Sequence, residues 1–129
     1  MSRRMSCALT MDAVRARTKT VTRRHPDTWK TLAVGDRLTL VEKAMGLPKG
    51  ARQIILAEVE IVDVRVEPLS RVLTEDFATI REGLPLMLRG DFIRFWLSTH
   101  GYQPKSPLTD ADLDTPCRRI EWRYLPAES

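Results

Sequence analysis

The sequence has few of the residues on which many catalytic sites depend. It contains two cysteines, Cys7 and Cys117, and two histidines, His25 and His100, among 129 residues. Two cysteines are too few for a disulfide framework, and they lack the spacing of a zinc site. We therefore expect neither a metal site nor a cofactor. A Ser-His-Asp triad could form only around the two histidines, and neither lies in a nucleophile motif.

Glycine-rich loops and long apolar segments are also missing. The six glycines lie too far apart for a dinucleotide-binding fingerprint or a phosphate-binding P-loop. No run approaches the roughly 18 apolar residues of a membrane-spanning helix. The N-terminus has a basic opening but no apolar core behind it, which is unlike a secretory signal. These absences predict a cytoplasmic protein with no membrane partner.

The composition is typical of one folded domain. Hydrophobic residues make up 43% of the chain and charged residues 29%, as in ordinary globular proteins. A chain of this length buries roughly two-thirds of the surface that it exposes when unfolded. A hydrophobic core alone is therefore expected to hold a single domain together, without a disulfide or a structural metal.

Positive charge is concentrated near the N-terminus. The net charge is +4, but residues 1–30 carry eight basic and two acidic side chains, while the other 99 residues sum to −2. Within that segment, residues 17–24 read Arg-Thr-Lys-Thr-Val-Thr-Arg-Arg. Phosphate oxygens accept hydrogen bonds from both cations and hydroxyl groups, so this run favours a polyanion as a partner. A solvated basic face without a partner would have the same composition.

The hydrophobic pattern predicts an α+β domain. Helices are expected over residues 11–17, 73–80 and 91–98. A strand or an extended turn is expected over residues 18–24, and strands are expected over residues 37–43, 54–67 and 117–124. Residues 101–116, which prolines interrupt, are expected to form a loop.

Two of the predicted strands carry information about the sheet. In the long strand, one parity is shared by Ile55, Ala57, Val59 and Ile61 and the other by Val62, Val64 and Val66, so the inward face is expected to change between Ile61 and Val62. A β-bulge at that point would keep both halves of the strand in one core, as a small closed barrel requires. In the last strand, alternation predicts that Trp122 faces inward and Arg119 faces outward.

Together these features resemble the ASCH family, whose fold is a PUA-like β-barrel. The resemblance rests on Ala16-Arg-Thr-Lys-Thr-Val-Thr-Arg-Arg24 after a helix, on Gly35-Asp36 opening a strand, on Glu82-Gly83 ending a helix, and on the alternating last strand. It extends over about residues 6–125. The sequence departs from the family pattern at Ala16, where glycine is common, and at Thr18, which adds a residue between Arg17 and Lys19. The resemblance implies one domain over residues 1–129, with five to six strands and two to three flanking helices.

The resemblance also implies a function. ASCH proteins look like nucleic-acid or nucleotide binders, with RNA or a modified nucleotide in a basic cleft between barrel and helices. Cations would neutralise phosphates there, and Glu82 would bind an exocyclic amine or a base edge. Trp29 would either stack on a base or cover the core. The expected nucleic-acid-binding residues are Arg17, Lys19, Thr20, Thr22, Arg23, Arg24 and Trp29.

An enzyme is the alternative that the resemblance allows. Some ASCH proteins are amidohydrolases that deacetylate acetylcytidine nucleosides, and others are reported as ribonucleases. By position, the residues of the amidohydrolase site fall on Lys19, Thr22 and Glu82. Thr22 would be the nucleophile, Lys19 the base if desolvation lowered its pKa, and Glu82 an acid–base group or an anchor for the amine.

Backbone geometry restricts this alternative. In a flat strand Lys19 and Thr22 point to opposite faces, so the triad requires an irregular backbone between them. A third possibility is a protein-interaction module that presents its basic face to an acidic partner.

Overall fold

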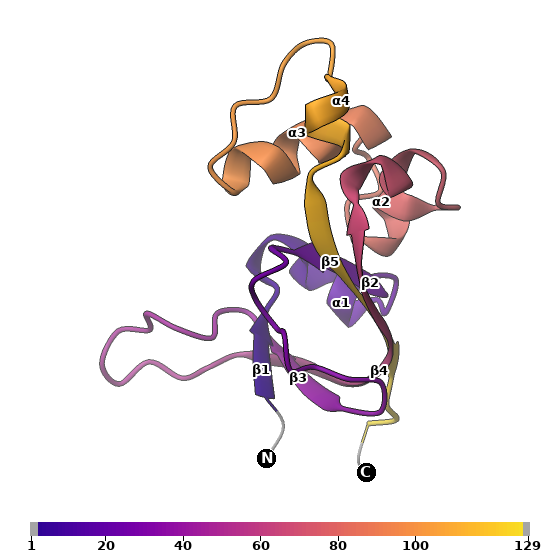
Figure 1. Cartoon of the computed structure of the whole chain (residues 1–129). Coiled ribbons are helices and arrows are strands. Elements are labelled where there is room, and N and C mark those ends of the chain that lie inside the picture. The colour runs from indigo at the N-terminus through magenta and orange to yellow at the C-terminus, as the bar shows by residue number, and fades with distance from the viewer. Residues whose placement is uncertain (1–2, 128–129) are drawn as a thin grey trace.

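A curled sheet of five strands organises the chain (Figure 1). The computed structural model describes residues 3–127. The strand order is β1-β3-β4-β5-β2, with β1 parallel to β3 and the other neighbours antiparallel. The strands are β1 (Arg3–Ser6), β2 (Val21–Arg24), β3 (Arg37–Val41), β4 (Ile55–Pro68) and β5 (Pro116–Tyr124). The predicted strands are therefore present, and β1 is an additional strand that the sequence pattern did not indicate.

The sheet is a half-barrel rather than the closed barrel that we predicted. Its two edge strands, β1 and β2, have four residues each and do not pair with one another. A side chain crosses the opening instead, because Arg24 Nη2 donates a hydrogen bond to the carbonyl oxygen of Ser6 over 2.8 Å. The broader prediction of an α+β domain with a small, strongly curved sheet is confirmed.

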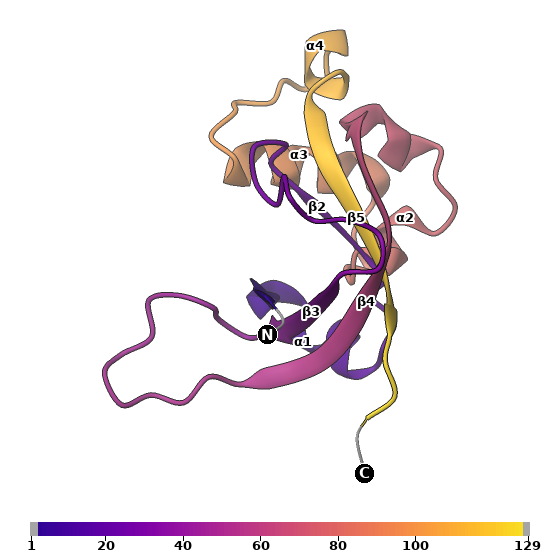
Figure 2. The same cartoon turned by 60° about the horizontal axis from the view of Figure 1, so that its bottom comes forward.

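Helical segments connect and cover the strands (Figure 2). The α-helices are α1 (Met11–Arg15), α2 (Ala78–Arg81), α3 (Arg89–Thr99) and α4 (Asp110–Leu113), and the 3-10 helices are η1 (Ala8–Thr10) and η2 (Leu69–Leu73). The helix predicted over residues 73–80 is wrong, because Phe77 adopts a left-handed conformation with φ 56° and interrupts it. The predicted loop contains α4, which Thr109 and Asp112 cap reciprocally. None of the described helices has the length and apolar character of a membrane span.

The long strand β4 contains the predicted bulge, where its pairing with β5 shifts register between Ile61 and Asp63. Beyond the bulge the expected inward face is wrong at Val62 and Val66, which are exposed, whereas the half-buried Val64 packs against the core. Glu67 is buried instead. The physical reason is charge pairing, since the buried Arg23 of β2 lies 3.4 Å from this carboxylate.

The buried apolar residues form two clusters. One lies inside the half-barrel around Met5, Leu38, Ile61 and Trp122. The other lies between α3 and η2 and includes Ile93, Leu97 and Cys117. Burial raises the pKa of the Cys117 thiol to about 12, so this cysteine is expected to be an inert part of the core.

Gly83 positions the end of α2 against α1, and its replacement by alanine is expected to destabilise the fold. Its φ is +87°, and a Cβ atom would lie 3.0 Å from Thr10 Cβ and 3.1 Å from Ala13 Cβ. These atoms are attached directly to the backbone of another segment and have little freedom to move. We expect Gly83→Ala to cost about 2–4 kcal/mol, from backbone strain and overpacking together.

Thermal unfolding provides the measurement, and Gly35→Ala provides the control. Gly35 has a similar φ of +93°, but a Cβ atom there would meet nothing within 4 Å. The loss of Tm in Gly35→Ala therefore measures the cost of backbone strain without overpacking. Equal losses of Tm in the two variants would contradict the close packing of Gly83 against α1.

Candidate functional site

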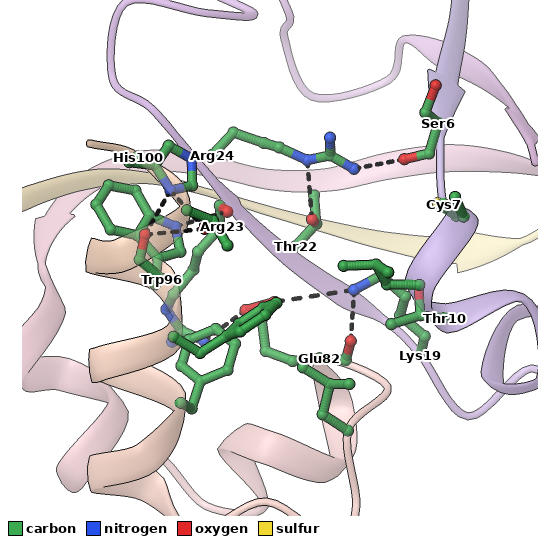
Figure 3. A pocket seen from close by; sticks show the side chains of 16 residues that line it. Ser6, Cys7, Thr10, Lys19, Thr22, Arg23, Arg24, Glu82, Trp96 and His100 are labelled. Atoms are coloured by element: carbon green, nitrogen blue, oxygen red, sulfur yellow. Dashed lines mark hydrogen bonds and ion pairs between the residues drawn. The ribbon is translucent and has the colours of Figure 1, made fainter. Parts of the chain in front are cut away.

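The opening between β1 and β2 leads into a pocket of about 310 Å³ (Figure 3). Ser6 and Cys7 line it from the end of β1, and Thr22 and Arg24 line it from β2. The far wall comes from α3 and from the segment that follows α2. The pocket therefore occupies the place where a closed barrel would have paired its edge strands.

Lys19 and Glu82 form a buried pair at the base of this pocket. Lys19 Nζ donates a hydrogen bond of 2.5 Å to the backbone oxygen of Glu82 and lies 3.8 Å from Glu82 Oε1. Each side chain is only 4% exposed. Burial lowers the pKa of Lys19, although the Glu82 carboxylate opposes this shift. The amine is therefore neutral in a larger fraction of molecules than an ordinary lysine.

The backbone before β2 is irregular, as a site containing Lys19 and Thr22 requires. Strand β2 begins at Val21, so Lys19 lies outside the regular ladder. Its carbonyl oxygen accepts hydrogen bonds from Trp122 Nε1, over 3.1 Å, and from the Tyr124 hydroxyl. These two contacts to β5 hold Lys19 so that its side chain and that of Thr22 both line the pocket.

Thr22 receives a hydrogen bond from Arg24, the side chain that also crosses the opening of the sheet. Arg24 Nε lies 3.0 Å from Thr22 Oγ1 and is the donor. A hydroxyl oxygen that accepts in this way keeps its own hydrogen for another partner. Thr22 is therefore arranged to give up a proton while a positive charge faces its oxygen.

Arg23 also lines the pocket, and its buried side chain holds Glu82 in place. Its side chain is 0% exposed. Its guanidinium contacts Glu82 at 2.9 Å, Glu75 at 2.9 Å and Glu67 at 3.4 Å. Burial opposes the charged form of Arg23, but these three carboxylates outweigh it, so its pKa is raised. Arg23 occupies Glu82 Oε2 and leaves Oε1 facing Lys19.

Arg119 extends the same cluster, and the expectation that it faces solvent is wrong. Its side chain is 2% exposed and contacts Glu75 at 2.6 Å and Glu121 at 2.8 Å. Alternation places charged residues outward by default. Here the carboxylate of Glu75, between η2 and α2, and that of Glu121, on β5 itself, meet the arginine.

An aromatic wall faces the polar residues across the pocket. Trp96 on α3 donates from Nε1 to the backbone oxygen of Arg23 over 2.9 Å. The His100 ring stacks on Trp96 at 3.8 Å between centroids, with 16° between the planes, and His100 Nδ1 lies 2.7 Å from Trp96 O. Phe95 completes this wall. Trp96 is also buried in the apolar cluster beside α3. Sequence reasoning did not single out His100, although its spacing of four residues from Trp96 places the two on one helix face.

Three of the predicted nucleic-acid-binding residues lie outside the pocket. Thr20 receives a hydrogen bond from Arg81 Nε over 3.3 Å. The guanidinium of Arg17 lies 5.6 Å from the centre of the Tyr124 ring. Trp29 packs against the half-barrel core. The structure thus brings together Lys19, Thr22, Arg23, Arg24 and Glu82 in one pocket.

Fold and site together define a class: a small α+β half-barrel whose opening holds a buried lysine–glutamate pair. Two solved structures share this fold. Hypothetical protein PH0355 has a TM-score of 0.59 and 14% identity, over 97% of this chain and 100% of that one. Protein EF3133 from Enterococcus faecalis, of the DUF984 family, has a TM-score of 0.59 and 13% identity, over 97% of this chain and 76% of that one.

These likenesses show the fold alone. No family model matches this sequence, and no curated protein matches it. Neither structural neighbour is described as an ASCH protein, so membership of that family stays a prediction.

Proposed function

We propose that this chain is a small amidohydrolase that removes an acyl group from the exocyclic amine of a nucleoside, with acetylcytidine as the expected substrate. The observation that supports this proposal most strongly is the desolvated Lys19 beside Thr22 and Glu82 in one pocket. A lysine with a lowered pKa serves as a general base near neutral pH. A lysine with a purely structural role does not need a lowered pKa.

The size and lining of the pocket support a small substrate. A volume of about 310 Å³ lies at the lower end of the range of about 300–1,000 Å³ that is typical of small-molecule sites. One side is polar, and the opposite side carries Phe95 and the stacked pair of Trp96 and His100. A flat base with one reactive amide fits this division, because its ring faces the aromatic wall while its acyl group reaches Lys19.

In the proposed reaction Thr22 Oγ1 attacks the carbonyl carbon of the acyl group. The hydroxyl proton passes to the neutral Lys19 amine, and the Lys19 ammonium then gives a proton to the departing exocyclic nitrogen. Glu82 Oε1 accepts a hydrogen bond from the exocyclic amine of the substrate. A water molecule hydrolyses the acyl ester on Thr22, which releases acetate and restores the hydroxyl. Arg24 stabilises Thr22 Oγ1 when it loses its proton.

No direct hydrogen bond joins Lys19 and Thr22 among the residues that the structure describes. The proton transfer therefore requires one bridging water or a rotation of the Lys19 side chain toward Thr22.

Release of cytidine from acetylcytidine, followed by chromatography, tests the proposal with a matched pair of threonine variants. We expect Thr22→Val to reduce kcat at least about 100-fold, because it removes the nucleophile but keeps the shape of the side chain. Thr20→Val lies nearby but outside the pocket and is expected to stay within about threefold of wild type. Full activity of Thr22→Val, or no turnover by the wild-type protein, would refute the proposed site.

Binding of a nucleotide or RNA without chemistry is the second candidate. It is favoured by the positive charge of residues 1–30 and by Arg24 in the pocket wall. The fully buried Arg23, which three carboxylates hold, is not free to neutralise a phosphate. Binding of single-stranded RNA would weaken steeply with salt. The logarithm of the binding constant would fall with the logarithm of the salt concentration, with a slope of about −0.7 per phosphate contact. Affinity that does not depend on salt would contradict this candidate.

A further inference from the structure

Thr10 lines the pocket between β1 and β2, but the proposed reaction gives it no task. The residue is 9% exposed. Every other side chain of the lining that carries a nitrogen or oxygen atom forms a hydrogen bond. The Thr10 hydroxyl forms none with any residue that the structure describes. A buried hydroxyl without a protein partner is unfavourable unless it meets water or a ligand.

Helix capping does not account for this threonine. Thr10 occupies the position directly before α1, where a threonine oxygen ordinarily accepts a hydrogen bond from the second or third N–H of the helix. The Thr10 side chain makes no such bond. Thr109 occupies the same position before α4 and does accept from the N–H of Asp112, over 3.1 Å. The two threonines therefore share a position relative to a helix but not a role.

Packing fixes Thr10 beside the reacting groups. A Cβ atom at Gly83 would lie 3.1 Å from Thr10 Cγ2, so the methyl group of Thr10 faces Gly83 and its hydroxyl is turned elsewhere. The Lys19 amine donates to the backbone oxygen of Glu82, in the peptide unit that joins Glu82 to Gly83. Thr10 and Lys19 therefore contact the same short segment. Figure 3 shows the Lys19 amine between Thr10 and Thr22.

The proposed reaction has no donor assigned to the acyl oxygen of the substrate. When Thr22 Oγ1 bonds to the carbonyl carbon, an electron pair moves onto the carbonyl oxygen, and the enzyme has to stabilise this negative charge until the C–N bond breaks. Arg24 donates to Thr22 Oγ1 and to the backbone oxygen of Ser6. Lys19 has to be neutral when Thr22 attacks. A further donor in the pocket wall would complete the site.

We propose that the Thr10 hydroxyl is this donor and gives a hydrogen bond to the acyl oxygen in the tetrahedral intermediate. The inference rests on the proposed function of the pocket. Thr10 keeps its proton throughout. Its hydrogen bond strengthens as the C=O bond becomes a single bond, and weakens when the carbonyl re-forms and the exocyclic nitrogen departs with the proton from Lys19. Side-chain hydroxyl groups act in this way in other oxyanion-binding sites.

Thr10→Val and Thr109→Val are compared for release of cytidine from acetylcytidine and for Tm. We expect Thr10→Val to lower kcat about 100- to 1,000-fold with little change in KM, and to change Tm by less than about 2 °C, because no protein hydrogen bond is lost. Thr109→Val removes a capping bond outside the pocket. It is expected to lower Tm by about 2–6 °C and to keep kcat within about twofold of wild type. Thr10→Ser retains the hydroxyl and is expected to keep kcat within about fivefold.

A sulfur substrate separates direct contact with the acyl oxygen from a structural effect. Thioacetylcytidine carries sulfur in place of that oxygen, and sulfur is a weak acceptor of hydrogen bonds. The ratio of kcat for the oxygen and sulfur substrates is expected to fall at least about tenfold from wild type to Thr10→Val, because the variant lacks the donor that distinguishes the two atoms.

The possible failures of this inference and of the proposed function differ. An unchanged ratio, or wild-type kcat in Thr10→Val, would overturn the role of Thr10. If Thr22→Val is inactive in the same assay, the proposed function stands without it. No turnover of acetylcytidine by the wild-type protein would overturn both.

Discussion

Lys19→Met is expected to abolish the hydrolysis of acetylcytidine and, at the same time, to make the folded protein more stable. Loss of the general base lowers kcat by about 100- to 10,000-fold. Methionine fills much of the same buried volume without a charge to desolvate. Glu82 keeps its contact with Arg23 at 2.9 Å, so the substitution leaves no isolated buried carboxylate. We expect a gain on the order of 1 kcal/mol at pH 7.

The dependence of this gain on pH follows from the direction of the Lys19 shift. Because burial lowers the pKa of Lys19 in the folded state, the unfolded chain binds more protons between that lowered value and the ordinary value of about 10.4. Wild-type stability therefore rises with pH across this window. The advantage of Lys19→Met is largest below the folded pKa and fades toward pH 10.

Urea unfolding at pH 7 and pH 9.5 measures this effect, with Lys30→Met as the control. Lys30 is 62% exposed, so its replacement is expected to change stability by less than about 0.5 kcal/mol at either pH. Lys19→Met with wild-type activity would exclude Lys19 as the base. A stability difference that does not depend on pH would contradict the lowered pKa.

Arg23→Met is expected to destabilise the fold by about 3–5 kcal/mol, the largest loss that we predict for a single substitution. Removing one partner of a buried ion pair leaves the other charges without compensation. Here three carboxylates, on Glu67, Glu75 and Glu82, lose the same guanidinium. Arg65→Met is the control. Arg65 contacts two carboxylates at 2.7 Å but is 52% exposed, and its loss is expected to cost less than about 1 kcal/mol.

Low pH is expected to reduce the difference in the free energy of unfolding between wild type and Arg23→Met. Burial alone would raise the pKa of Glu75, but the hydrogen bond from Arg119 and the charges of Arg23 and Arg81 lower it. A carboxylate with a lowered pKa stabilises the fold above its unfolded value, and this contribution is lost as pH falls through the folded value. Urea unfolding at pH 7 and pH 4 is expected to show a smaller difference at pH 4. A constant difference, or a loss no larger than that of Arg65→Met, would contradict the central role of Arg23.

Arg23 thereby connects the stability of the fold to the geometry of the site. Its guanidinium holds one oxygen of Glu82, while its backbone oxygen accepts from Trp96 in the aromatic wall. Arg23 was expected to contact a phosphate, but it instead bonds to residues of both walls of the pocket. We infer that loss of Arg23 disturbs Glu82 and Trp96 together.

The sequence by itself determined the elements whose signal is local. The bulge in β4 lies where the parity of the apolar residues changes after Ile61, although Val62 and Val66 are exposed. The last strand follows from its alternation. Helix α3 follows from its apolar stripe. Short elements escaped this reasoning, because the four residues of β1 or α4 contain too few periods to show a pattern.

Tertiary structure alone decided what surrounds each charged residue. Alternation assigns Arg119 to solvent, and only the meeting of β5 with Glu75, 44 residues away in the chain, buries it. Lys19 and Glu82 are separated by 63 residues, so resemblance suggested their convergence but no local pattern contained it. The open edge between β1 and β2 likewise depends on packing, because whether a curled sheet closes is set by how its strands meet and not by the periodicity of any one of them.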